Sequence, residues 1–371
     1  MAELNKEEML HIVEENIKKI EDKDFNVYFF VLDTKGNPSG SLEYIYETAL
    51  TLFKLGYKVT MIHQEKEFIG AEEWLGSKYN EIPHKNVETD NVEIGPCDFL
   101  FIPEIFANVM GQTKTLPCKR VIILQNYNFL CEFMPVGATP FDMNINDVIT
   151  TSESQKKIIE GYFPGIRTHI VKPCIKNIFR HSNNPQKLIV NIVSKSQHDV
   201  NRIVKPFYWK YPIYKWVSFR DLRSVSQDVF ANALKEAALT IWIDESSCFG
   251  YSALEAMRSG TILLAKIPNK LTDWNIEENE KGKTLTNACI WFDDLDDLPD
   301  MIASIVRTWT LDEIPEDVYE SEKKFDKQFT HEQQEEDIEK VYVEELFNKR
   351  KNEFEEVLIQ LKNNGLDLKK K

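Results

Sequence analysis

The sequence is poor in the features that mark membrane-spanning, disulfide-stabilised and metal-binding proteins. It has no run approaching the ~20 consecutive apolar residues that span a bilayer, so we expect no membrane-spanning helix. Its six cysteines show neither Cys-x-x-Cys pairs nor zinc-ligand spacing, which predicts reduced thiols in a cytoplasmic protein. A P-loop, a Gly-x-Ser-x-Gly elbow and a His-Glu-x-x-His motif are also missing. These absences argue against a P-loop nucleotidase, a serine hydrolase and a zinc protease.

Positive charge is scarce as well. The chain has 45 Lys and Arg against 60 Asp and Glu, a formal net charge of −15, which disfavours broad binding to nucleic acid. One segment departs from this balance, because residues 195–223 interleave basic and aromatic side chains. Two interpretations of this basic aromatic segment are open. It forms a donor-phosphate site with an acceptor or DNA surface, or it is an insertion that packs its aromatic rings and exposes its charges.

Apolar runs alternate with helical patterns along the chain. With 371 residues and 42% hydrophobic content, two domains of ordinary size are expected. In the first half, a strand at Val27–Leu32 leads through the glycine-bearing loop 36–40 into a helix at Leu42–Leu55, and Gly56–Ile62 supplies the next strand. Open parallel sheets bind ligands at the carboxyl ends of their strands, which is where this loop lies. Further strands are predicted at 98–102, 120–124 and 147–152.

The second half begins the same pattern again with a strand at Lys187–Val193. Strands at 215–219, 239–243 and 262–265 follow, and an amphipathic helix is expected at Asp296–Trp309. These two series predict two Rossmann-like α/β domains that face each other across a cleft and join near residue 173. No signal peptide is visible; Met1–Lys23 is charged and predicts an amphipathic helix packed on the protein. The charged tail 332–371 predicts one or two helices.

The most informative stretch is Asp244–Thr261. It follows the apolar strand at 239–243, turns at Phe249-Gly250-Tyr251, and continues as a helix that ends at Gly260. A strand, a glycine turn and a helix N-terminus together make an anion site, because backbone N–H groups and the helix dipole point at the same place. Glu255 lies one turn into this helix, where its carboxylate can accept hydrogen bonds from sugar hydroxyls.

This stretch resembles the donor-binding signature of family 4 glycosyltransferases with the GT-B fold. Phe249-Gly250, Leu254-Glu255-Ala256-Met257 and Gly260 match the signature in register, while Ser247 stands where the family has the first of its two glutamates. Weaker matches support the resemblance over residues 26–347. Ser39-Gly40 takes the place of a Gly-Gly pair, and residues 324–332 are similar to the terminal motif that opens a helix returning to the first domain.

The resemblance implies a role for each matching residue. Glu255 binds the ribose, the backbone of Gly250, Tyr251 and Ser252 holds the diphosphate together with Lys195, and Ser39-Gly40 closes the cleft. A second cation, Arg202 or Lys205, completes the pyrophosphate site. Gln125 or Asn126 stands where the family often carries a histidine. The implied catalytic residues are Glu255, Lys195 and Asn126. The implied donor-binding residues are Ser39, Gly40, Lys195, Arg202, Ser247, Phe249, Gly250, Tyr251, Ser252 and Glu255.

The function implied is transfer of a hexosyl or pentosyl group from a UDP-, GDP- or ADP-sugar to an acceptor, with retention and without a metal. A fixed cation would stabilise the leaving diphosphate. Residues 1–172 would form the acceptor-side domain, 173–330 the donor domain and 331–371 a helical segment. The acceptor is a glycan, a lipid, a protein or a modified DNA base. Two alternatives stay open: a phage-type enzyme acting on a hydroxymethylated base in DNA, and a catalytically inactive GT-B scaffold that binds a partner.

Overall fold

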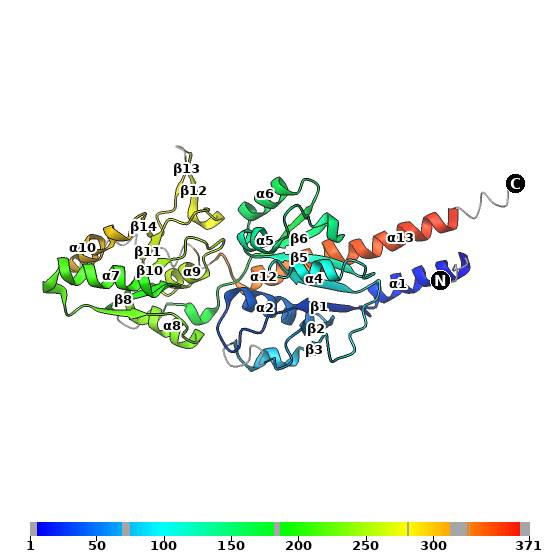
Figure 1. The fold of residues 1–371 in the computed structure, drawn as a ribbon, viewed down its shortest axis with the longest axis horizontal. Coiled ribbons are helices and arrows are strands. Elements are labelled where there is room, and N and C mark those ends of the chain that lie inside the picture. Colours follow the sequence, from blue (N-terminus) through cyan, green and yellow to red (C-terminus); the bar gives the residue numbers. More distant parts are fainter. Residues whose placement is uncertain are drawn as a thin grey trace. The chain divides into compact units, whose positions relative to one another are not determined.

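The computed structural model describes residues 6–68, 75–181, 186–279, 282–311, 325 and 327–363. The chain forms two compact units (Figure 1). The first comprises Met1–Thr151, Lys156–Val171 and Glu335–Lys371, and the second comprises Ser152–Gln155 and Lys172–Gln334. Lys324 and Asp326 of the predicted terminal motif lie outside the described residues, as does the end of the charged tail at 364–371.

The first unit is built on a seven-stranded parallel sheet. Its strands are β1 (Asn26–Phe30), β2 (Lys58–His63), β3 (His84–Asn86), β4 (Phe99–Pro103), β5 (Lys119–Leu124), β6 (Asp147–Thr150) and β7 (Arg167–Ile170). They lie in the order β3-β2-β1-β4-β5-β6-β7, which is the Rossmann order extended by one edge strand. The order reverses beside β1, so the switch point of this sheet lies between β1 and β4.

Helices and 3-10 turns connect these strands. They are α1 (Lys6–Glu21), α2 (Gly40–Lys54), η1 (Ser77–Glu81), α4 (Ala107–Gln112), α5 (Tyr127–Phe133), η2 (Phe141–Met143) and α6 (Glu153–Tyr162). The C-terminal helices are α12 (His331–Ile338), a π-helical stretch η7 (Glu339–Phe347) and α13 (Asn348–Asn363). One core joins α2 and η7 to the same face of the sheet, with Tyr342 and Phe347 among its buried rings. The predicted return of the C-terminal helices to the first domain is confirmed.

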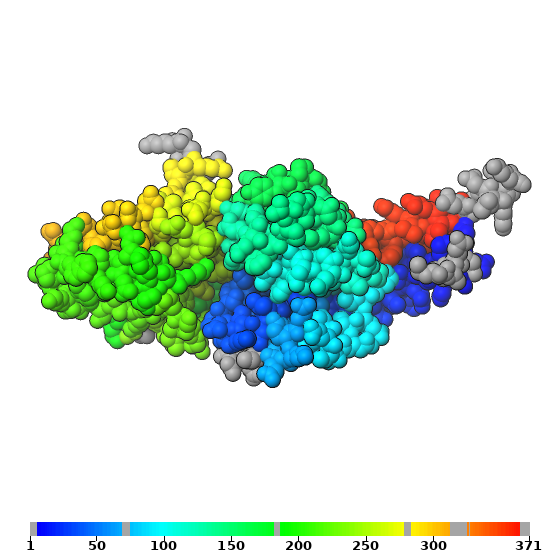
Figure 2. Space-filling model, viewed as in Figure 1, coloured from blue at the N-terminus to red at the C-terminus, as the bar shows by residue number. Residues whose placement is uncertain are grey.

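The two ends of the first unit's sequence pack against each other. Helices α1 and α13 lie side by side, at the blue and red ends of the colour scale in Figure 2. Val13 and Ile20 are buried on α1, as its amphipathic pattern predicts. Lys351 and Lys362 of α13 each pair with a glutamate of α1 at 3.0 Å. In the described part of the chain, no helix is long and apolar enough to cross a membrane.

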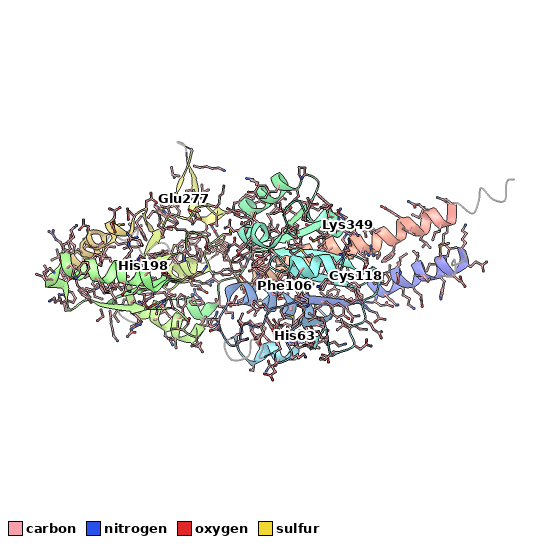
Figure 3. The ribbon with its side chains drawn as sticks, in the orientation of Figure 1. His63, Phe106, Cys118, His198, Glu277 and Lys349 are labelled. Atoms are coloured by element: carbon pink, nitrogen blue, oxygen red, sulfur yellow. The ribbon has the colours of Figure 1, made fainter. Side chains whose placement is uncertain are left out.

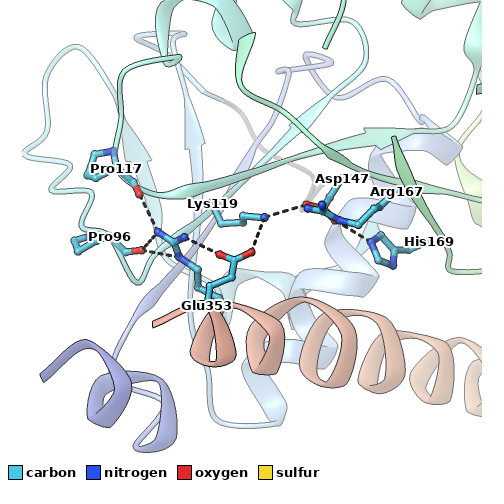
Figure 4. Close-up of polar contacts among 8 residues, drawn as sticks. Pro96, Pro117, Lys119, Asp147, Arg167, His169 and Glu353 are labelled. Atoms are coloured by element: carbon cyan, nitrogen blue, oxygen red, sulfur yellow. Dashed lines mark hydrogen bonds and ion pairs between the residues drawn. The ribbon is translucent and has the colours of Figure 1, made fainter. Parts of the chain in front are cut away.

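A buried charge network joins the C-terminal helices to the amino ends of β5, β6 and β7 (Figure 4). Asp147 is fully buried and accepts hydrogen bonds from Arg167 at 2.7 and 2.5 Å, with Lys119 Nζ at 3.1 Å. Lys119 also reaches Glu353 of α13 at 3.4 Å. Burial would raise the pKa of Asp147, but hydrogen bonds from His169 and Arg167 and the charge of Lys119 hold it well below its usual range. The network lies at the sheet edge opposite the carboxyl ends of the strands.

The second unit has a five-stranded parallel sheet and a small antiparallel hairpin. Its strands are β8 (Lys187–Ser194), β9 (Ser218–Asp221), β10 (Ala237–Ile243), β11 (Ile262–Lys266) and β14 (Ile290–Phe292), in the order β14-β11-β10-β8-β9. The hairpin pairs β12 (Ile276–Asn279) with β13 (Gly282–Leu285). The helices are η3 (Asn177–Phe179), α7 (Gln197–Lys210), η4 (Pro212–Tyr214), α8 (Gln227–Glu236), α9 (Tyr251–Arg258), η5 (Asp273–Asn275), η6 (Leu295–Asp297) and α10 (Leu298–Thr310).

Alternate strand residues divide the second core between the two faces of its sheet. Side chains such as Ile241 and Leu264 pack under α7 and α10, whereas Trp242 and Leu263 pack under α8 and α9. This period-two division is what near-continuous apolar strands produce when both faces are covered by helices. The sheet with helices on both faces confirms the predicted α/β class for this half of the chain.

The basic aromatic segment divides its rings between core and surface. Phe207 is fully buried and contacts the rings of Tyr208, Tyr211 and Tyr214. In contrast, three apolar side chains face solvent: Trp209 is 75% exposed, Ile213 73% and Trp216 56%. Its charges are largely paired with neighbouring acids, in the ion pairs Arg202–Asp296, Lys210–Asp300, Arg220–Glu236 and Arg223–Asp221. Most of the segment therefore behaves as packed rings with solvated, paired charges.

Candidate functional site: the carboxyl edges of the two sheets

The switch point of the second sheet lies between β8 and β10. The chain leaves β8 through α7 on one face of the sheet and leaves β10 through α9 on the other, because the two helices belong to different halves of the core. Diverging helices open a crevice beside the carboxyl ends of those two strands, which is the usual ligand position in an open parallel sheet. Lys195 follows β8 and Asp244 follows β10, so both lie at this point.

The turn between β10 and α9 is held by its own side chains and by one tryptophan. Ser247 donates its N–H to the Asp244 carbonyl at 3.2 Å, and its hydroxyl accepts the Gly250 N–H at 2.8 Å. Trp274 donates its indole N–H to the Phe249 carbonyl at 2.5 Å. Ser247, in the position of the family's first glutamate, therefore shapes the backbone of the turn.

Gly250 is required here for two separate reasons. Its φ of +83° is a left-handed conformation that L side chains rarely adopt. A Cβ at this position would also lie 2.9 Å from Trp274 Cζ2, closer than such contacts allow. With Gly250 as the N-cap, α9 begins at Tyr251, and its first turn carries N–H groups that have no partner within the helix. The predicted turn and helix start are confirmed.

Helix α9 buries one side and presents the other. Ala253, Leu254, Ala256 and Met257 are buried, whereas Tyr251, Ser252 and Glu255 are half-buried. Phe249 is buried against Tyr251 and Phe329, with ring centroids 4.7 and 5.4 Å apart. The helix ends where predicted, because Gly260 has φ +78° and a Cβ there would meet the His181 ring at 2.3 Å.

Ion pairs cover the strand tips of the second sheet. Lys195 is 76% exposed and lies 2.8 Å from Asp244. Lys266, at the tip of β11, lies 2.9 Å from Asp293 and 3.6 Å from Glu245. Burial lowers the pKa of Lys266, but the carboxylates of Asp293 and Glu245 outweigh it and raise the pKa above its usual value. The sequence analysis missed Lys266; its position directly after an apolar strand was the available signal.

The two proposed second cations lie on α7. Arg202 pairs with Asp296 of η6 at 2.8 Å, and Lys205 is exposed. The first turn of α7 contains His198, labelled in Figure 3, whose N–H is capped by the Ser196 hydroxyl at 3.1 Å. The candidate cations therefore have different partners. Lys195 pairs with Asp244, which follows β10, whereas Arg202 pairs with Asp296 of η6.

The switch point of the first sheet gathers a second set of residues. Ser39 caps α2, accepting the Leu42 N–H at 3.4 Å, so the helix begins at Gly40. Asn126 caps α5 in the same way, accepting the Asn128 N–H at 3.0 Å. Gln125 donates its side-chain N–H to the Ser41 carbonyl at 2.8 Å, which joins the tip of β5 to the first turn of α2.

A buried carboxyl group fixes this arrangement. Glu104 follows β4, is 4% exposed, and accepts the N–H groups of Gln125 and Asn126 at 3.1 and 2.8 Å. Burial raises the pKa of Glu104 to about 7, against the hydrogen bonds, which lower it. Gln125 Oε1 is buried without a hydrogen-bond partner in the described residues. Sequence reasoning missed Glu104, although a polar residue directly after an apolar strand is the same signal that pointed to Gln125.

Metal ligation finds no support in the described residues, where no group of three or more His, Cys, Asp or Glu side chains is placed to hold an ion. The first switch point instead offers the Ser39 hydroxyl and the Gln125 and Asn126 amides, and the second offers lysines and the N-terminus of α9. Such groups suit a phosphorylated or hydroxyl-rich organic ligand.

Comparison with known proteins rests on structure alone. No protein-family profile matches the chain, and no curated protein sequence matches it. The sucrose-phosphate synthase of Thermosynechococcus elongatus superposes with a TM-score of 0.61 at 12% identity, covering 88% of this chain and all of its own. The pneumococcal O-GlcNAc transferase GtfA, solved with UDP and GlcNAc, gives 0.59 at 10% identity over 90% and 99%. The catalytic domain of Arabidopsis thaliana starch synthase IV, bound to ADP and acarbose, gives 0.54 at 11% over 88% and 99%. The chain therefore has the GT-B fold, with two Rossmann-like units, as the sequence predicts.

Proposed function

We propose that this chain transfers a sugar from a nucleotide-sugar donor to an acceptor. The observation that carries the proposal is the turn before α9. Gly250 turns the backbone so that α9 begins after β10 at the switch point of the second sheet, where Lys195 pairs with Asp244 at 2.8 Å. Backbone N–H groups, a helix dipole and a lysine together suit a diphosphate. The GT-B fold, shared with proteins solved with UDP and ADP, supports the same conclusion.

In this proposal the donor lies on residues 173–330. The backbone of Gly250, Tyr251 and Ser252 and the ammonium of Lys195 bind the diphosphate, with the Gly250 N–H exchanging the Ser247 hydroxyl for phosphate, and Glu255 accepts the ribose hydroxyls. Lys195 exchanges Asp244 for phosphate on binding. Lys195 is 76% exposed, so it can leave Asp244 and remain solvated or bound to phosphate. The second cation is Arg202, Lys205 or Lys266.

Residues 1–172 supply the acceptor side, with the helical segment 331–371 attached to them. Ser39 and Gly40 at the start of α2, and Asn126 at the start of α5, would face the sugars. We assign the chain to the family 4 type and propose retention of configuration. The leaving diphosphate then takes the acceptor's proton, so no side-chain base is needed. We also propose that the reaction needs no metal, because Lys195 and α9 stabilise the leaving charge.

A nucleotide screen tests this function. Thermal shift is measured with UDP, ADP and GDP, and hydrolysis or transfer is measured with the matching hexose and pentose donors. We expect one nucleoside diphosphate to stabilise the chain and its sugar to be turned over. Glu255→Gln should reduce that nucleotide's affinity by about 1.5–3 kcal/mol, roughly ten- to hundredfold, because it removes a charge-assisted hydrogen bond. Asp228→Asn, on the exposed side of α8, serves as the matched control. Failure of all three nucleotides to bind contradicts the proposal.

An inactive binding scaffold is the second candidate, and one observation favours it. The residue in the position of the family's first glutamate is Ser247, whose hydroxyl accepts the Gly250 N–H. A scaffold would be stabilised by the nucleoside diphosphate and would turn over none of its sugars. The same screen therefore separates the two candidates.

A further inference from the structure

A cysteine and a histidine meet in the second unit, away from both switch points. Cys174 lies between β7 and η3, and His331 begins α12. The Cys174 sulfur is 3.4 Å from His331 Nδ1 and 3.9 Å from Nε2. The backbones of these two segments are joined directly, because Ile175 donates its N–H to the Phe329 carbonyl at 2.7 Å. The contact thus belongs to two fixed segments.

Charged groups of both signs belong to the segments around Cys174. Arg258 of α9 is buried and donates to the carbonyl of the adjacent Ile175 at 2.5 Å. Lys172 and Lys176 flank the cysteine in sequence. Helix α12 carries four acids, Glu332, Glu335, Glu336 and Asp337, and the pKa of Glu332 is lowered by its own backbone N–H and by the Thr330 hydroxyl. The activation of Cys174 therefore rests on the contacting imidazole, which can take the thiol proton and leave a thiolate.

The other cysteines differ from Cys174. Burial raises the pKa of Cys97 and of Cys118, labelled in Figure 3, to about 11. Burial likewise raises the pKa of Cys289, and Cys248 is buried beneath the β10–α9 turn. Cys131 is exposed on α5 and serves as an internal reference thiol. Cys174 combines partial exposure with a contacting base, which is the environment of nucleophilic thiols.

We propose that Cys174 is a reactive thiol, activated by His331, that is modified by soft electrophiles and hydroperoxides. His331 takes the thiol proton, and the thiolate sulfur attacks the distal oxygen of a hydroperoxide. The S–O bond forms as the O–O bond breaks, and the departing alkoxide or hydroxide takes the proton back from the imidazolium. The cysteine is oxidised to a sulfenic acid, and the hydroperoxide is reduced to an alcohol or water. One thiol condenses with the sulfenic acid to give a disulfide and water, and a further thiol then reduces that disulfide and restores Cys174.

Both residues belong to the second unit and are close in sequence to points where the chain changes unit. The chain leaves the first unit at Val171 and returns to it at Glu335, within a few residues of Cys174 and His331 respectively. A group added to the sulfur displaces the imidazole from its contact and so acts on both connecting segments. This proposal is independent of the proposed glycosyl transfer, because neither residue belongs to the donor or acceptor sites.

Iodoacetamide labelling of the full-length chain tests the activation. The rates at Cys174 and Cys131 are followed by peptide mass spectrometry between pH 6 and pH 9.5. Dividing each rate at pH 6.5 by the same cysteine's rate at pH 9.5 removes the difference in accessibility. We expect this ratio to be about tenfold higher at Cys174, because an ordinary thiol with a pKa near 8.5 is only about 1% ionised at pH 6.5. Hydrogen peroxide should block labelling at Cys174 before Cys131, and dithiothreitol should restore it.

His331→Gln separates activation from exposure. This variant should bring the Cys174 ratio down to that of Cys131, while Cys174→Ser confirms the peptide assignment. Equal ratios at the two cysteines in the wild type would overturn the proposal, and so would a Cys174 profile unchanged by His331→Gln. The wild-type comparison decides the matter even where His331→Gln fails to fold.

Discussion

Replacing Gly250 by alanine tests the geometry of the β10–α9 turn. Two effects oppose the new methyl group. The backbone is left-handed at φ +83°, and the Cβ would lie 2.9 Å from Trp274 Cζ2. Trp274 has little freedom to yield, because it is 5% exposed and its indole N–H is bonded to Phe249. We therefore expect the turn or the tryptophan to move.

The two effects can be separated with a second glycine. Gly137 has φ +80°, but a Cβ there would meet nothing within 4 Å. Gly137→Ala thus pays only the left-handed strain of about 1–2 kcal/mol, partly offset by the reduced entropy of the unfolded chain. Gly250→Ala adds overpacking against Trp274, which costs about 1–3 kcal/mol. At about 2–4 °C per kcal/mol for a domain of this size, the difference between the variants is about 2–12 °C.

Scanning calorimetry with and without nucleoside diphosphate measures both consequences. Each variant is compared with the wild type for the transition of the unit that contains the substitution. The loss of melting temperature relative to the wild type should be larger for Gly250→Ala than for Gly137→Ala by about 2–12 °C. Gly250→Ala should also lose much of its stabilisation by nucleotide. Gly137→Ala should keep that stabilisation in full. Equal melting losses in the two variants would refute the role assigned to the Trp274 contact.

Three further substitutions test other parts of the structure. Asp147→Asn should reduce the free energy of unfolding by about 3 kcal/mol at pH 7, because it removes the buried partner of Arg167, Lys119 and His169; Arg167 is 39% exposed, which limits the loss. The loss should shrink as the pH falls below about 4, where Asp147 takes up a proton in the unfolded chain while its native carboxylate, with its lowered pKa, stays ionised. Asp300→Asn, in an exposed pair, should leave the denaturation midpoint unchanged. Burial raises the pKa of Glu104 to about 7, so the stability of the wild type should fall as the pH rises from about 4.5 to 7. Glu104→Gln should remove up to about 3 kcal/mol of that pH dependence. If the free energies of unfolding of the two proteins, measured in urea, change equally between about pH 5 and pH 8, the assignment is contradicted. Lys195→Ala should weaken nucleotide binding about tenfold in titration calorimetry, and this loss should be smaller at high salt because salt screens the lysine–phosphate attraction. Arg202→Ala should weaken binding less, because Arg202 pairs with Asp296.

The second unit could be predicted closely because its features are local in sequence. The apolar run before Asp244 can only be buried, and Gly250 and Gly260 mark backbone positions with positive φ on either side of α9. The helix expected at Asp296–Trp309 is present as α10, preceded by the 3-10 turn η6. In each case the element is indicated by the spacing of apolar residues or by a glycine within a stretch of about 15 residues. Tertiary packing does not change the element that this local pattern predicts.

Other features depend on residues that are distant in sequence. Strand β7 has three polar residues of four and lies at an edge, where its Arg167 and His169 pair with Asp147 of the neighbouring strand. The π-helical stretch η7 is set by packing on the sheet and has no sequence period of its own. Glu104 acquires its role only when β4 and β5 pair and bring the Gln125 and Asn126 N–H groups to its carboxylate. A single sequence indicates that such residues are polar but not which partners they meet.

The two switch points differ in how their charges are arranged, and the difference bears on mechanism. At the first, the Glu104 carboxyl group is buried after β4 and accepts the two N–H groups that follow β5, so the two strand tips are joined before any ligand arrives. At the second, the half-buried Asp244 carboxylate pairs with Lys195, which itself stays 76% exposed. A diphosphate carries more charge than one carboxylate and adds the N–H groups of α9, so it can displace Asp244 from Lys195. Under the proposed function, the donor side thus changes partners on binding while the acceptor side stays rigid, and Asp244→Asn should strengthen nucleotide binding while Glu104→Gln leaves it unchanged.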